Sequence, residues 1–76
     1  MKHGYSSRVI KLNQAADVTS IGVKLGRMCI EYDVPVTTIA EKLGVTRQTV
    51  YNWFCATHKP STKQSTAIEE LLLDFT

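Results

Sequence analysis

Two short segments with helical periodicity stand on either side of one glycine, Gly44. Before this glycine, Ile39, Ala40 and Leu43 recur at the spacing of one helix face. Gly44 supplies the left-handed conformation that ends a helix, and Thr46 can cap a new helix two residues later. The small Ala40 lets the two helices approach closely. The chain is therefore predicted to contain two helices, at about residues 35–43 and 47–54, joined by a tight turn.

Further helices are expected on both sides of this pair. Thr19 or Ser20 can cap a helix that ends near residue 33, because the residue before Pro35 avoids the helical region. Its apolar face is predicted to contain Ile21, Leu25, Met28 and Tyr32. A last helix, capped by Ser61 or Thr62, carries an apolar stripe of Ala67, Ile68, Leu71, Leu72 and Phe75.

The fold class that follows is all-α, a compact bundle of four to five short helices that contains a helix-turn-helix. Residues 1–18 lack the helical pattern, and their apolar run from Arg8 to Leu12 is short. We expect an extended N-terminal arm or a short strand there. Lys2, Arg8 and Lys11 on such an arm could wrap DNA or enter its minor groove, and the alternatives are a frayed tail or a strand that pairs with a partner chain. The predicted organisation is an arm over residues 1–18 and a helix-turn-helix domain over residues 19–76.

Size and composition exclude several classes of function. A chain of 76 residues supports one small domain and no deep catalytic cavity. It carries no glycine-rich phosphate loop and no set of metal ligands at suitable spacing, so we expect neither an enzyme nor a cofactor. Cys29 and Cys55 are expected to be free thiols. No apolar run is long enough to span a membrane and no signal segment opens the chain, so a cytoplasmic, DNA-associated location is expected.

The predicted helix at residues 47–54 has a distinctive outward face. With about 100° per residue, Val50 can face the core together with Trp53, while Gln48 and Asn52 point away from it. Asn and Gln amides can bond N6 and N7 of adenine in the major groove, and an arginine can reach guanine or a phosphate. The residues predicted to read bases are Arg47, Gln48, Tyr51 and Asn52.

These residues carry a resemblance to a known family. The stretch from Ile39 to Val50, followed by Trp53 and by Lys59-Pro60-Ser61, resembles the Cro/repressor-type helix-turn-helix family, also described as lambda-repressor-like. The resemblance implies sequence-specific binding of double-stranded DNA, often as a homodimer on a palindromic operator. It also implies phosphate contacts at Thr46 and Thr49.

The sequence departs from that family at several positions. Cys29 and Phe54 replace a frequent Arg–Glu pair, which predicts an apolar contact in place of a salt bridge. Val36 replaces a glutamine that commonly bonds phosphate, which leaves backbone N–H groups and Thr37 for that role. The turn after residue 54 lacks the usual glycine. Further phosphate contacts are expected from the polar residues that follow the helix: His58, Lys59 and Lys63.

The predicted function is a transcriptional regulator that reads the major groove, with Leu73 and Phe75 as candidate dimer contacts. Two alternatives remain open. The same motif resembles DNA-recognition modules of transposases and phage terminases, which recruit a larger machine. It is also compatible with an adaptor that binds a protein such as RNA polymerase, because fold does not fix function.

Overall fold

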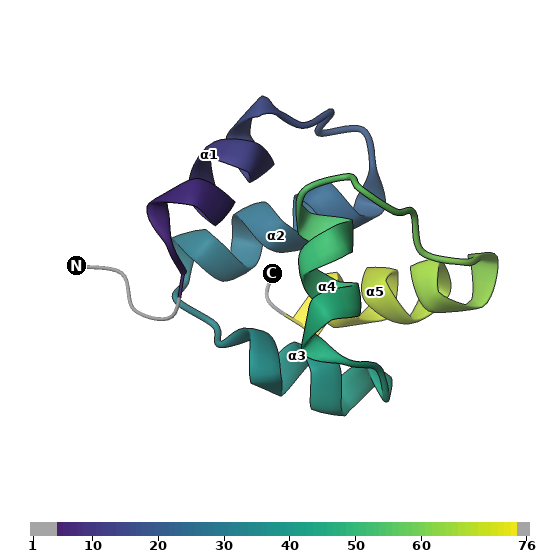
Figure 1. Ribbon diagram of the computed structural model, residues 1–76. Coiled ribbons are helices and arrows are strands. Elements are labelled where there is room, and N and C mark those ends of the chain that lie inside the picture. The colour runs from purple at the N-terminus through teal and green to yellow at the C-terminus, as the bar shows by residue number, and fades with distance from the viewer. Residues whose placement is uncertain (1–4, 75–76) are drawn as a thin grey trace.

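The computed structural model describes residues 5–74, which form five helices around one core (Figure 1). Their bounds are α1 (Ser7–Ala15), α2 (Ile21–Glu31), α3 (Val36–Leu43), α4 (Arg47–Phe54) and α5 (Thr62–Asp74). No strand occurs within this described part of the chain. The predicted all-α bundle is therefore confirmed. Phe75, placed by the sequence on the last helix, and Lys2, placed on the arm, lie outside the described residues.

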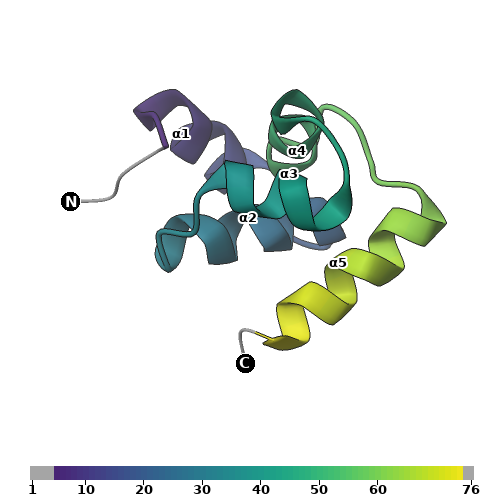
Figure 2. The ribbon, with the colours of Figure 1, turned by 90° about the horizontal axis from the view of Figure 1, so that it is seen from below.

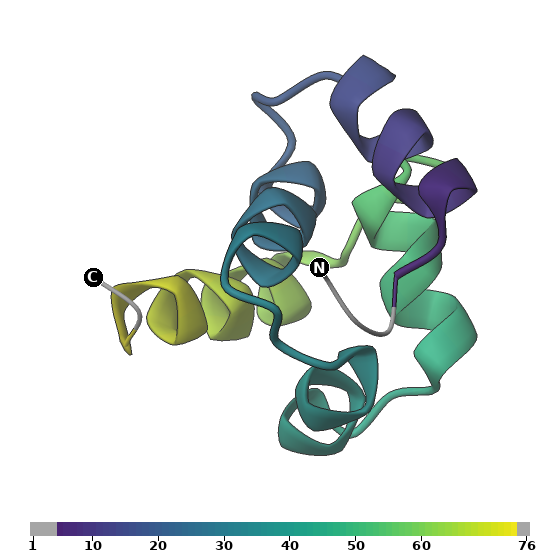
Figure 3. The ribbon, with the colours of Figure 1, turned by 90° about the vertical axis from the view of Figure 1, so that its left-hand side faces the viewer.

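The helix α2 lies at the centre of the bundle and packs against α1, α4 and α5. Seen from below, α1 and α4 lie on one side of α2 and α5 lies on the other (Figure 2). A side view shows α1, α4 and α3 following one another along that first side (Figure 3). The surface around α4 is therefore framed by α1 and α3, while α5 closes the opposite side of the core.

The expected arm or short strand near the N-terminus is wrong for residues 7–15, which form α1. Ser6 caps this helix by accepting a hydrogen bond from the Val9 amide (3.2 Å). Asn13 is buried at its inner face, where its amide donates to the backbone oxygens of Val23 (3.2 Å) and Phe54 (2.8 Å). A polar residue at an inward position interrupts the apolar stripe, which is why the periodicity of α1 was not evident.

The buried face of α2 also differs from the predicted one. Leu25 is fully buried as expected, but Tyr32 is 62% exposed. The innermost positions include Gly22, Gly26 and Cys29 instead. Glycines add nothing to a hydrophobic pattern, yet their lack of a side chain brings α2 close to α4. Cys29 and Phe54 both belong to the apolar core, in agreement with the predicted loss of the salt bridge.

Tyr5 closes the core beside Cys29. Its hydroxyl donates to the Val34 oxygen (2.6 Å), and its ring packs against Tyr51 and Phe54. Burial raises the pKa of the Cys29 thiol to about 12, although its hydrogen bond with Tyr5 acts in the opposite direction. Burial, followed by the neighbouring Cys29, raises the pKa of Tyr5 as well. Both groups therefore remain protonated in the fold at pH values where an unfolded chain ionises.

The fold is expected to lose stability in alkali because of this thiol. Between the ordinary thiol pKa of 9.0 and about 12, the unfolded chain loses the Cys29 proton while the folded protein keeps it. The free energy of unfolding should then fall by up to roughly 1.4 kcal/mol per pH unit. Urea denaturation at pH 8, 9 and 10 measures this slope, and Cys29→Ala should flatten it. An equal slope in both proteins would contradict the assignment.

Ala56, two residues after the end of α4, adopts a left-handed conformation with φ of 62°. This is the turn where the resembling family has glycine, and a side chain in this region costs about 1–2 kcal/mol. Ala56→Gly is expected to stabilise the fold by about 0.5–1 kcal/mol, after the greater chain entropy of glycine is subtracted. Thermal denaturation checks this, with the exposed Ala15→Gly as a control that should destabilise α1. A lower melting temperature for Ala56→Gly would contradict it.

Candidate nucleic-acid interface

The helix-turn-helix is formed by α3 and α4, and its turn follows the sequence prediction closely. Gly44 adopts φ of 67° and donates its amide hydrogen to the Ala40 oxygen, as does Val45 (3.0 Å). Thr46 then caps α4, because its hydroxyl accepts from the Thr49 amide (3.2 Å). The hydroxyls of Thr46 and Thr49 lie 2.9 Å apart at the start of α4. The turn thus presents two exposed or half-buried hydroxyl groups beside the first turn of the helix.

The two sides of α4 have opposite character. Val50, Trp53 and Phe54 are buried, so the predicted inward side is confirmed. Arg47 and Gln48 are exposed, and Tyr51 and Asn52 are half-buried. The structure therefore leaves polar groups of all four predicted base-reading residues on or near the surface of one short helix.

Gln48 and Asn52 form a hydrogen-bonded pair. Gln48 Nε2 donates to Asn52 Oδ1 across one helical turn (3.1 Å). The bond uses one hydrogen of Nε2 and leaves Oε1 and the other hydrogen of Gln48 available to a ligand. An amide oxygen and an amide hydrogen on one group are what N6 and N7 of adenine require together. The hydrogen bond to Asn52 therefore fixes the orientation of the Gln48 amide.

The four predicted base-reading residues do not share one depression. Gln48, Tyr51 and Asn52 line a groove of about 340 Å³ against α1, whereas Arg47 lines a hollow of about 490 Å³ on the α3 side. Thr37, predicted to contact phosphate, lies in the same hollow as Arg47. Arg47 thus shares a hollow with the predicted phosphate contacts Thr37 and Thr46, whereas the neighbouring Gln48 lines the groove on the other side of α4.

Tyr51 also has a packing role. Its ring meets the rings of Tyr5 and Phe54 edge to face, with centroids 6.5 and 6.3 Å apart. Such contacts fix the position of the ring at the border of the core. A substitution of Tyr51 would therefore disturb the fold as well as any contact with a base.

The polar loop after α4 folds back on the end of that helix. The backbone amides of Thr57 and His58 both donate to the backbone oxygen of Asn52 (2.9 and 3.3 Å), and the His58 side chain is exposed. Lys59 lies in a hollow with Asp17, and the lysine charge helps to lower the pKa of that carboxyl, after the stronger effect of hydrogen bonds from Thr19. An acid therefore lies beside one of the predicted phosphate contacts. Lys63 is exposed in the first turn of α5.

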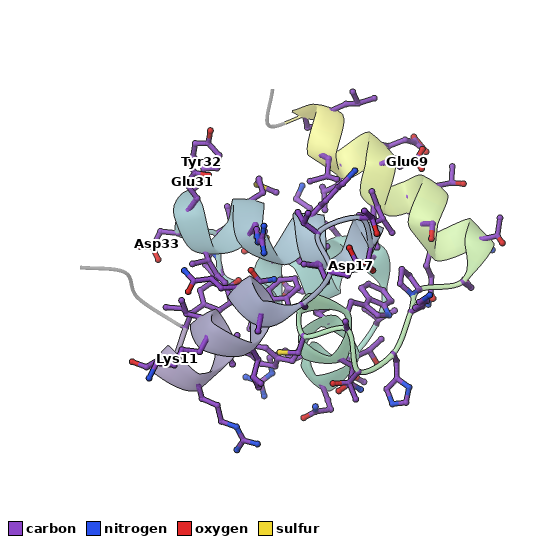
Figure 4. The ribbon with its side chains drawn as sticks, turned by 90° about the horizontal axis from the view of Figure 1, so that it is seen from above. Lys11, Asp17, Glu31, Tyr32, Asp33 and Glu69 are labelled. Atoms are coloured by element: carbon purple, nitrogen blue, oxygen red, sulfur yellow. The ribbon has the colours of Figure 1, made fainter. Side chains whose placement is uncertain are left out.

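Sequence reasoning placed Arg8 and Lys11 on an arm that could contact DNA, but it did not predict that they lie on a helix packed beside α4. Arg8 and Leu12 of α1 line the groove whose other wall contains Gln48 and Asn52. Neither α1 nor α4 contains an acidic residue. In Figure 4, Lys11 lies on the α1 side, while Glu31 and Glu69 lie on the side away from α4. The charged residues that α1 and α4 contribute to the surface between them are therefore all basic.

Within residues 5–74, the structure contains no group of three or more His, Cys, Asp or Glu residues that could hold a metal ion. None of the helices in this described part is long and apolar enough to cross a membrane. Cys29 and Cys55 are both free thiols.

Residues 24–59, just under half of the chain, match the family model of a homeodomain-like domain. The match runs from α2 through α3 and α4 into the loop at Lys59. No curated protein and no solved structure matches the chain. The match supports a helix-turn-helix family and DNA binding without selecting the Cro/repressor type. Over residues 24–59, this chain is thus similar to homeodomain-like domains, and the match includes the helix-turn-helix formed by α3 and α4.

Proposed function

We propose that the protein is a sequence-specific, double-stranded DNA-binding transcriptional regulator that reads the major groove with α4. The observation that carries this proposal is the Gln48–Asn52 amide pair on the outward side of a capped helix in a helix-turn-helix. An α-helix of about 10–12 Å diameter fits a major groove about 12 Å wide. The pair would then face the edges of the bases, with Gln48 bonding an adenine.

The remaining residues have proposed roles that follow their positions. Arg47 would contact a guanine or a phosphate from the α3 side, and Tyr51 would contact a base at the border of the groove. Hydroxyl, imidazole and ammonium groups on both flanks would bind phosphates, which supply affinity and register without sequence information. These phosphate contacts are Thr37, Thr46, Thr49, His58, Lys59 and Lys63.

We further propose a Cro/repressor type of action, with a homodimer on a palindromic site that blocks polymerase by occupying the DNA. One module buries only about 600–1,000 Å² of its surface on DNA, so a single chain would bind weakly. The exposure of Leu73 on α5 (71%) supports a contact between two copies through α5. No catalytic step and no cofactor belong to this function.

Selection from a random duplex library at about 150 mM salt tests the proposal. A palindromic motif with half-sites about one turn (10–10.5 base pairs) apart is the expected result. A single half-site would contradict the dimer and keep sequence-specific binding. Absence of enrichment, with binding that disappears as salt rises, would contradict the function itself because only attraction to the backbone would remain.

A further inference from the structure

The groove between α1 and α4 combines a base-reading wall with a cationic wall. Its α4 wall contains Gln48 and Asn52, and its α1 wall contains Arg8, with a volume of about 340 Å³ between them. The groove contains no acidic residue among its lining side chains. The cationic wall is thus not neutralised from within the groove.

The position of α1 beside α4 is fixed by contacts on its inner side. Asn13 donates to the backbone oxygen of Phe54 (2.8 Å), and the Tyr5 ring, just before α1, contacts the rings of Tyr51 and Phe54. Arg8 itself is exposed. Its charge also reaches Cys55, directly after α4, because it opposes the rise that burial causes in the pKa of that thiol. The packed helix α1 therefore places the exposed Arg8 guanidinium next to the outward side of α4.

We propose that α1 forms a second wall of the DNA interface, and that Arg8 binds the phosphate backbone of one strand when α4 occupies the major groove. The inference rests on the proposed function. A helix inserted in the major groove nearly fills its width, so an element packed alongside that helix meets the wall of the groove, which is phosphate. Guanidinium groups bind phosphate with two parallel hydrogen bonds. Arg8 would fix the depth and angle of α4, and it would contribute affinity without base preference.

The test is the salt dependence of binding for matched variants. Dissociation constants of the full chain for the selected duplex and for a scrambled duplex are measured between about 50 and 200 mM salt. Arg8→Ala should reduce the slope of log affinity against log salt by about 0.9 and weaken both duplexes equally. Arg8→Lys should retain the slope, because it keeps the charge.

Lys42→Ala is the matched control. Lys42 lies in a hollow on the α3–α5 side with Glu70 and Asp74, so its removal changes the net charge equally without touching the groove. It should leave the slope of the wild type unchanged. Thermal denaturation of each variant verifies that the exposed substitutions leave the fold intact.

An unchanged slope for Arg8→Ala, in a protein that prefers the selected duplex, would overturn this inference and leave the proposed function standing. A loss for Arg8→Ala that occurs on the selected duplex alone would also overturn it, because Arg8 would then read a base. A wild type without preference for the selected duplex would contradict the proposed function, and the slope of Arg8→Ala would still decide whether Arg8 meets phosphate.

Discussion

Replacing Gly26 with alanine is expected to destabilise this protein by about 1–3 kcal/mol, although alanine is the better helix former. Gly26 faces the contact between α2, α1 and α4. A Cβ atom there would lie 2.5 Å from Asn13 Nδ2 and 2.8 Å from Phe54 Cγ. Neither neighbour can move freely, because Phe54 is fully buried and the Asn13 amide is held by two backbone oxygens. Relief of the clash would separate α1 from the helix that carries the interface.

The measurement is thermal or urea denaturation of Gly26→Ala beside Lys24→Ala. Lys24 is exposed on the same helix, so its substitution should change stability by no more than about 0.5 kcal/mol. In a domain of this size, the expected loss for Gly26→Ala corresponds to a melting temperature lower by roughly 4–8 °C per kcal/mol. Wild-type stability for Gly26→Ala would show that α2 and α4 are less closely packed than the structure has them.

The second large effect is expected for base preference. Gln48→Ala should reduce discrimination at one position of the DNA site by about 1–3 kcal/mol, because it removes the bidentate contact to adenine. Asn52→Ala should affect the same position, since the Asn52 oxygen holds the Gln48 amide (3.1 Å). The two losses should not add, because the residues act as one unit.

A panel of the selected duplex and its single-base variants measures this effect for each protein. The variants should lose affinity for the selected duplex and bind the substituted duplex as the wild type does. Gln14→Ala is the matched control, because it removes an exposed amide that lies in the hollow between α1 and α2. Equal losses on all members of the panel would contradict base reading by the amide pair.

Local signals predicted the helix-turn-helix well. Gly44 and Thr46 mark a helix end and a helix start with chemistry that few other residues offer, so the bounds of α4 were predicted correctly. Ser61 likewise exchanges hydrogen bonds with Gln64 at the start of α5, in a capping box that fixes where α5 begins. Caps and turns depend on neighbours in sequence, and the sequence alone therefore reveals them.

The features of the fold that the sequence did not predict depend on tertiary contacts. Asn13 is polar and buried, and only its partners at Val23 and Phe54 explain that position. Gly22 and Gly26 belong to the buried face of α2 because α4 packs closely against them. The proximity of Arg8 to Gln48 follows from the same packing, across 40 positions of sequence. Long-range geometry of this kind leaves no periodic trace in the residues themselves.

The most direct test of the central claim, that the outward side of α4 binds duplex DNA, is a titration of the isotopically labelled protein with the selected duplex, followed by NMR. Amide signals report each residue separately in a chain of 76 residues. We expect the largest shift changes at residues 46–52, with further changes at Arg8 and His58. Changes centred on α5, or no changes at saturating duplex, would contradict it.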